Sequence, residues 1–76
     1  MKKTKIKLST IEDVRSFVNI VTAYTGEIDL SSGRYIVDAK SIMGIFSLDL
    51  MNPIELTAHG DDVDALFASI EKFIVE

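Results

Sequence analysis

Polar and apolar residues alternate in three short stretches of the chain, at residues 5–8, 27–30 and 54–59. This period of two is typical of strands that bury one face. A fourth stretch, residues 34–37, carries β-branched and aromatic side chains that favour extended chain. The Ser-Ser-Gly sequence at 31–33 predicts a turn between the second and fourth stretches. The pattern therefore predicts four strands, two of which form a hairpin.

Apolar residues at three- and four-residue steps predict three helices. Ser9 and Glu12 have the spacing of a capping box at the start of the first, and Gly26 is expected to end it as a left-handed cap. The second helix follows Ser41 and has room for about two turns before Pro53. The expected apolar stripes are Val14, Phe17, Val18, Val21 and Tyr24 in the first helix and Val63, Leu66, Phe67, Ile70, Phe73 and Ile74 in the third.

The predicted order of elements is β-α-β-β-α-β-α, without a linker or repeat that would divide residues 1–76 into more than one domain. Each alternating strand has a polar face, which predicts an α+β fold: a four-stranded, mostly antiparallel sheet with three helices on one face. A ferredoxin-like sensor domain is the alternative architecture. That fold pairs two long helices, whereas the second helix here is predicted to be short.

Composition narrows the classes of function. The chain has 76 residues, no Cys and a formal net charge of -4. The lack of Cys excludes a disulfide framework and a thiolate metal site, and the acidic balance disfavours nucleic-acid binding. No apolar run approaches the roughly 20 residues that cross a bilayer, and no apolar segment follows the basic residues at the start. We therefore expect a cytoplasmic protein that binds neither nucleic acid nor membranes.

Few residues in the chain could take part in catalysis, phosphoryl transfer or metal binding. His59 is the only imidazole, and we expect it to be an exposed residue at the end of a strand. No catalytic triad or Gly-rich phosphate loop accompanies it, so no enzyme activity and no cofactor are expected. Asp61, Asp62 and Asp64 lack the pattern of a calcium loop and are interpreted as a solvated helix start, so no metal site is predicted.

The segment Ala39-Lys40-Ser41-Ile42-Met43-Gly44-Ile45-Phe46-Ser47-Leu48 resembles the regulatory serine segment of HPr, the phosphocarrier protein of the bacterial sugar phosphotransferase system. The resemblance implies the HPr-like open-faced β-sandwich, which has the order of elements predicted above. It also implies that Ser41, besides capping a helix, is a candidate for regulatory phosphorylation by a bifunctional kinase. Partner proteins of the phosphotransferase system or its regulation would then contact Ile42, Met43 and Phe46.

The chain departs from the family where strand one meets the first helix. The family has a Gly-[Leu/Ile]-His-x-Arg-Pro segment there, and this chain reads Leu8-Ser9-Thr10-Ile11-Glu12-Asp13-Val14. An ungapped alignment from Ser41 puts Thr10 at the position of the phosphohistidine and Glu12 at that of the arginine. A Thr hydroxyl forms no labile phosphoimidazole, and a carboxylate repels phosphate. We therefore predict a protein-binding or regulatory module that has lost the histidine phosphocarrier site; an atypical phosphocarrier is the alternative.

Overall fold

The computed structural model of the protein describes residues 1–75, and Glu76 lies outside the described residues. The prediction of one domain over residues 1–76 stays a prediction. The elements are β1 (Lys2–Ile6), α1 (Ile11–Thr22), β2 (Ile28–Ser32), β3 (Tyr35–Asp38), α2 (Ile42–Phe46), β4 (Ile54–Ala58), α3 (Val63–Ser69), the 3-10 helix η1 (Glu71–Phe73) and β5 (Ile74–Val75).

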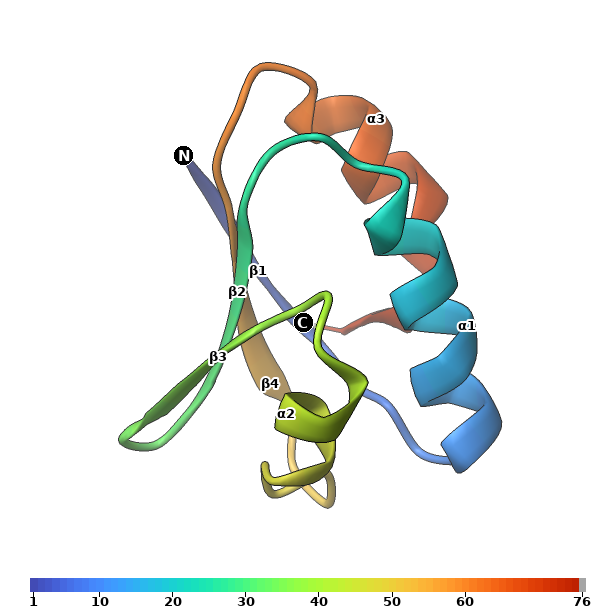
Figure 1. Ribbon diagram of the computed structural model, residues 1–76, viewed down its shortest axis with the longest axis vertical. Helices are drawn as coiled ribbons and strands as arrows, with labels where there is room; N and C mark the ends of the chain where they lie inside the picture. The colour runs from blue at the N-terminus through green and yellow to red at the C-terminus, as the bar shows by residue number, and fades with distance from the viewer. Residues whose placement is uncertain (76) are drawn as a thin grey trace.

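The strands form one antiparallel sheet in the order β3-β2-β4-β1-β5. The helices cover one face of the sheet and leave the other face open (Figure 1). This arrangement confirms the predicted α+β open-faced sandwich. The helix α2 has five residues and α1 has twelve, so the two long helices of the ferredoxin-like alternative are not present in residues 1–75.

The core lies between the sheet and the helices because β2 and β4 turn alternate apolar positions to the side that the helices cover. In β4, for example, Ile54, Leu56 and Ala58 are buried while Glu55 is exposed. The ring of Phe17 from α1 meets that of Phe73 edge-on, with centroids 5.8 Å apart. No polar or charged residue is buried among the described residues. The buried residues are Ile6, Leu8, Val14, Phe17, Val21, Ile28, Leu30, Ala39, Ile45, Leu48, Ile54, Leu56, Ala58, Leu66, Ile70 and Phe73.

The C-terminal segment departs from the predicted third helix. The helix α3 ends at Ser69, and Phe73 and Ile74 lie in η1 and β5 instead. The backbone N–H of Lys7 donates to the Phe73 carbonyl at 2.8 Å, and β5 then pairs with β1. The apolar spacing nevertheless buries Ile70 and Phe73, because a 3-10 turn keeps nearly the same residues on one side as an α-helix. The sheet thus gains a two-residue fifth strand.

Both predicted ends of the first helix are wrong in detail. Thr10, and not Ser9, is the N-cap of α1: its Oγ1 accepts the Asp13 N–H at 3.0 Å, while Asp13 Oδ2 accepts the Ser9 N–H at 3.1 Å. Thr10 and Asp13 therefore take the places predicted for Ser9 and Glu12, but the carboxylate accepts the N–H of Ser9 and not that of the N-cap residue. The helix ends at Thr22, and Gly26 does not have the positive φ of a left-handed cap.

Positive φ angles occur at two other glycines, Gly33 and Gly60, and both lie at turns. Gly33 has φ 61° and is the first residue of the two-residue loop between β2 and β3, where a type II′ turn requires a positive φ. Gly60 has φ 119° after β4. Within residues 1–75 no helix is long and apolar enough to cross a bilayer.

Candidate functional site

Ser41 caps the short helix α2, as predicted. Its Oγ accepts the Gly44 N–H at 3.2 Å, and its carbonyl accepts the Ile45 N–H at 3.0 Å. The residue is exposed, so the hydroxyl that forms the cap also faces solvent. The structure therefore gives Ser41 a structural role in starting the helix while leaving it reachable from outside.

The apolar residues of α2 divide between the core and the surface. Ile45 is fully buried, and Ile42 is half-buried against the core. Met43 is 76% exposed and Phe46 is 41% exposed. Of the three residues predicted to contact partners, Met43 and Phe46 thus point outward, whereas Ile42 contributes mainly to holding α2 on the sheet.

The start of α1 lies at the same end of the molecule as α2 and the loop that follows it (Figure 1). The Lys7 ammonium, just before α1, donates to the carbonyls of Leu50 (3.0 Å) and Met51 (2.6 Å) and ties that loop to the β1–α1 junction. Thr10 is exposed there, with Oγ1 engaged in the cap.

Two further apolar residues are exposed at this end: Ile11 is 66% exposed and Met51 is 83% exposed. Neither was singled out from the sequence. Their exposure could have been predicted, because Ile11 lies off the apolar stripe of its helix and Met51 lies in a loop rich in polar residues. We use the term apolar end surface for Ile11, Met43, Phe46 and Met51. Exposed apolar side chains gathered at one end of a small protein are typical of an interaction site.

Three carboxylates lie on the segments that carry the apolar end surface. Glu12 and Asp13 lie in the first turn of α1, and Glu12 Oε1 is 3.7 Å from Arg15 Nη1. Asp49, in the loop after α2, accepts hydrogen bonds from the Asn52 side chain (2.9 Å) and the Met51 N–H (3.0 Å), and these bonds lower the pKa of its carboxyl. This carboxylate stays charged at neutral pH. Negative charge at this end repels the phosphate group of a phosphoryl donor and attracts a partner with Lys or Arg on its surface.

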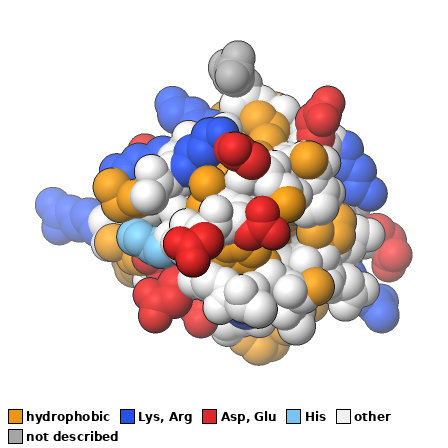
Figure 2. Space-filling model, turned by 90° about the horizontal axis from the view of Figure 1, so that it is seen from above, with side chains coloured by type: hydrophobic (Ala, Val, Ile, Leu, Met, Phe, Trp, Pro, Cys, Tyr) orange, Lys and Arg blue, Asp and Glu red, His pale blue; other side chains and the backbone are white. Residues whose placement is uncertain are grey.

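His59 lies away from this surface. It follows β4, whose other end pairs with the end of β1 that leads to α1, so the length of the strand separates the imidazole from Thr10. Its Nε2 is 3.5 Å from Asp29 Oδ2, and its carbonyl accepts the Tyr24 hydroxyl at 2.9 Å. Figure 2 shows the imidazole at the surface beside carboxylates. The structure agrees with the predicted strand-end position on the polar face.

The acidic residues before and within α3 do not form a metal centre. Asp62 is the N-cap residue but makes no side-chain capping bond, and Asp64 pairs with Lys2 at 2.9 Å. Across residues 1–75 no three His, Asp or Glu side chains come close enough to hold an ion. These residues are exposed, as expected for a solvated helix start.

Comparison with known proteins places this fold and its α2 segment in one family. The family described as "PTS HPr component phosphorylation site" matches residues 14–76. An HPr structure from Thermoanaerobacter tengcongensis, HPr-C-His, is 28% identical with a TM-score of 0.83, and the alignment covers 95% of this chain and 89% of that one. No curated protein sequence matches the chain.

Two other solved structures share the fold. The phosphocarrier protein HPr from Bacillus anthracis str. Ames is 23% identical with a TM-score of 0.75, over 97% of this chain and 94% of that chain. Crh, the Bacillus subtilis catabolite repression protein, is 26% identical with a TM-score of 0.67, over 95% and 88% of the two chains, and was solved as a domain-swapped, intertwined dimer.

The family match spans most of the chain, and the chain therefore belongs to the HPr family of the bacterial phosphotransferase system. Proteins of this family are phosphocarriers that interact with other proteins of that system, and they are not enzymes. The match begins at Val14, so the β1–α1 junction with Thr10 and Glu12 lies outside the matched residues.

Proposed function

We propose that this chain is an HPr-family protein without the histidine phosphocarrier site, which acts by binding protein partners through its apolar end surface. One observation carries the proposal. At the start of α1, the position that the resemblance gives to the phosphohistidine is occupied by Thr10, whose Oγ1 accepts a backbone N–H as the helix cap. The position two residues later, which the resemblance gives to an arginine, is occupied by Glu12.

The chemistry of this helix start opposes phosphoryl transfer through a histidine. A phosphoimidazole needs a ring nitrogen, and the only imidazole belongs to His59 at the far end of β4. Incoming phosphate also needs positive charge beside the acceptor. Lys7 turns its ammonium onto two loop carbonyls, and Arg15 lies beside Glu12.

The apolar end surface supports the binding role. Met43 is exposed on a helix whose neighbouring Ile45 anchors it in the core, so the contact residue is flexible and its backbone is fixed. Glu12 and Asp13 follow Ile11 in the first turn of α1, and Asp49 accepts the N–H of Met51, so carboxylates lie on the segments that carry this surface. We therefore propose a partner that offers an apolar pocket with Lys or Arg at its rim, among the proteins of the phosphotransferase system or its regulation.

Incubation with enzyme I and labelled phosphoenolpyruvate is expected to leave this chain without phosphohistidine, because no imidazole lies at the start of α1. Acid-labile, base-stable label is measured, with a histidine-containing HPr as positive control in the same reaction. Label that disappears in His59→Ala would establish an atypical phosphocarrier and overturn the proposed loss of the site.

Phosphorylation of Ser41 is the proposed form of regulation. A Gram-positive HPr kinase with ATP is expected to phosphorylate Ser41. The residue is exposed, and it lies in the sequence Lys-Ser-Ile-Met-Gly, which is typical of the regulatory serine segment in this family. The added charge of about -2 would lie at the exposed amide groups that begin α2. Intact-mass and fragment mass spectrometry measure the site. Ser41→Ala is expected to abolish modification and, through loss of the cap, to destabilise the protein by about 1 kcal/mol.

Matched variants test which residues around Ser41 the kinase needs in order to modify it. Ser47, at the other end of α2, is exposed as well, and its Oγ donates to the Gly44 carbonyl at 2.6 Å. Ser47→Ala is therefore expected to leave modification unchanged. Met43→Ser should slow it, whereas Tyr35→Ser, at an equally exposed apolar residue in β3, should not. An unmodified Ser41, under conditions that fully modify a histidine-containing HPr, would leave Ser41 with its capping role only.

A further inference from the structure

The strand β3 is the outermost strand on one side of the sheet, and no strand within residues 1–75 pairs with its outer edge. It pairs with β2 alone, from Tyr35 to Asp38. The last strand, β5, lies at the opposite edge, beyond β2, β4 and β1. The hairpin of β2 and β3 extends away from α1 and α3 (Figure 1). Tyr35 and Ile36 are each 70% exposed, so the neighbouring described elements leave this edge accessible.

Alternate residues of β3 direct their backbone groups to this open edge. The Ala39 N–H donates to the Ile28 carbonyl at 2.9 Å, so the backbone at Ala39 faces β2. Residues two apart on an antiparallel strand direct their backbone groups to the same side. Ile36 and Asp38 lie an odd number of positions before Ala39. The N–H and C=O groups of Ile36 and the N–H of Asp38 therefore face outward.

The sequence of β3 fits antiparallel pairing with itself. When a two-fold axis relates two β3 strands at Ile36, the outward backbone groups of that residue in the two copies can exchange two hydrogen bonds. The same register puts Tyr35 of one copy opposite Val37 of the other, so apolar residues meet. It also puts Arg34 opposite Asp38, so opposite charges meet. Cross-strand pairs of both kinds stabilise a sheet.

Neighbouring registers fit this edge worse. A shift of the pairing by two residues keeps the outward backbone groups facing one another but changes the side-chain pairs. Moving the axis one residue towards the C-terminus places Arg34 opposite Lys40, which has the same charge. Moving it one residue the other way places Arg34 opposite Ile36, which leaves the charge without a partner. The pattern of charges therefore selects the register centred on Ile36.

We propose that two copies of this chain pair along β3, so that their sheets join into one continuous antiparallel sheet. The occupant is a second copy because the strand carries one charge of each sign, placed symmetrically about Ile36. Such short strands bury little area, so the dimer is expected to be weak, with a dissociation constant of about 0.1–1 mM. The interface uses no residue of the apolar end surface and is independent of the function proposed above.

Dilution of the ¹⁵N-labelled full chain tests the pairing, with sedimentation equilibrium to measure the mass. The largest concentration-dependent amide shifts are expected at Ile36 and Asp38, whose N–H groups would gain partners. Ile36→Pro removes an outward N–H and no hydrogen bond to β2, so the variant should fold but associate at least about tenfold more weakly. The matched control Ile36→Val keeps the N–H and an apolar β-branched side chain, and should associate like the parent chain.

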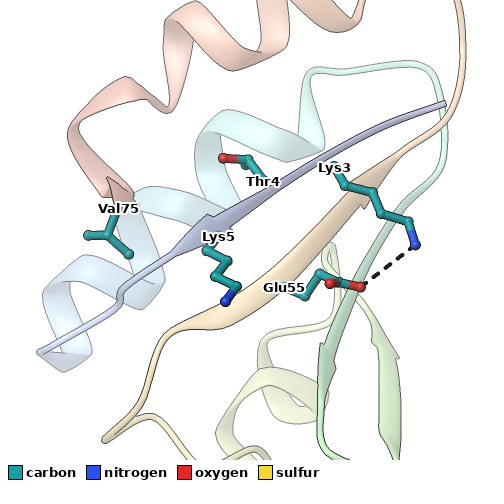
Figure 3. A pocket seen from close by; sticks show the side chains of 5 residues that line it. All are labelled: Lys3, Thr4, Lys5, Glu55 and Val75. Carbon is teal, nitrogen blue, oxygen red and sulfur yellow. Dashed lines mark ion pairs between the residues drawn. The ribbon is translucent and has the colours of Figure 1, made fainter.

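Two charge variants test the register. Arg34→Glu and Asp38→Lys should each weaken self-association about tenfold, because each places like charges opposite one another at both ends of the interface. An equimolar mixture should recover it, because the two substitutions together restore opposite charges in the mixed pair. The control Lys5→Glu makes the same change of charge as Arg34→Glu at the other edge of the sheet, where Lys5 pairs with Val75 (Figure 3), and should leave association unchanged.

Three outcomes would overturn the proposal. The first is a chain that sediments as a monomer at about 2 mM, well above the expected dissociation constant. The second is a dimer that Ile36→Pro and both charge variants leave unchanged, which would place the contact elsewhere on the molecule. The third is a mixture of the two charge variants that does not recover association, which would exclude the register centred on Ile36. Thermal unfolding of each variant shows that the fold is kept.

Discussion

Replacing Phe17 by Ala is expected to lower the free energy of unfolding by about 3–5 kcal/mol, the usual cost of truncating a buried Phe. Phe17 is fully buried at the centre of α1, and its ring packs edge-on against Phe73 from the C-terminal segment. The cavity would therefore loosen both α1 and the chain that leads into β5. Because small domains have about 5–15 kcal/mol of stability in total, urea unfolding should show a large fall in the midpoint.

Phe67→Ala is the matched control for that measurement. The sequence places Phe67 at the centre of an apolar stripe, but the structure leaves it half-buried, with the Lys2 ammonium 4.9 Å from its ring centroid. We expect its truncation to cost about 1–2 kcal/mol, in keeping with partial burial. An equal or larger loss for Phe67→Ala than for Phe17→Ala would contradict the packing described here.

The substitution Gly26→Ala is expected to destabilise the protein by about 3 kcal/mol, at the upper end of the usual cost of overpacking. A Cβ at this position would collide with the His59 carbonyl and lie 2.6 Å from Cε2 of Tyr24. The same carbonyl accepts the Tyr24 hydroxyl, and the His59 N–H donates to the Glu27 carbonyl, so the backbone cannot move without losing hydrogen bonds. Thermal unfolding of the two proteins measures the difference.

Gly33→Ala supplies the comparison for Gly26. Nothing lies within 4 Å of a Cβ at Gly33, so its cost comes only from the positive φ of 61° and should be about 1–2 kcal/mol. If Gly26→Ala proved as stable as the parent protein, the close approach of the α1–β2 connection to the end of β4 would be wrong.

The proposed function requires that the fold be kept while the histidine site at the start of α1 is lost. Of the residues that hold α2 on the sheet, Ile45 belongs to the core and Ile42 packs against it, whereas Thr10 and Glu12 are exposed at a helix start. Substitution at such exposed positions costs little stability as long as a capping side chain remains, and Thr is a good N-cap. The proposed loss of phosphotransfer therefore requires no change of architecture.

Much of the fold could be predicted from the sequence because hydrophobic burial depends on local periodicity. The alternation in β2 and β4, the cap at Ser41 and the shortness of α2 are all local features, and the helical spacing in α2 also locates Met43 at the surface. The acidic start of α1 and the distance in sequence between His59 and that helix were equally visible.

Only the tertiary structure decided the features that depend on contacts between distant residues. The residues of β5 continue the apolar spacing of the preceding helix, and they become a strand because β1 offers them an unpaired edge. Gly26 serves a close approach to His59, 33 positions later, which no local pattern encodes. Ile11 and Met51 join Met43 at one end because Lys7 ties a loop to the start of α1. The sequence by itself determined which residues avoid water, and the packing of the elements determined which of the remaining residues share a surface.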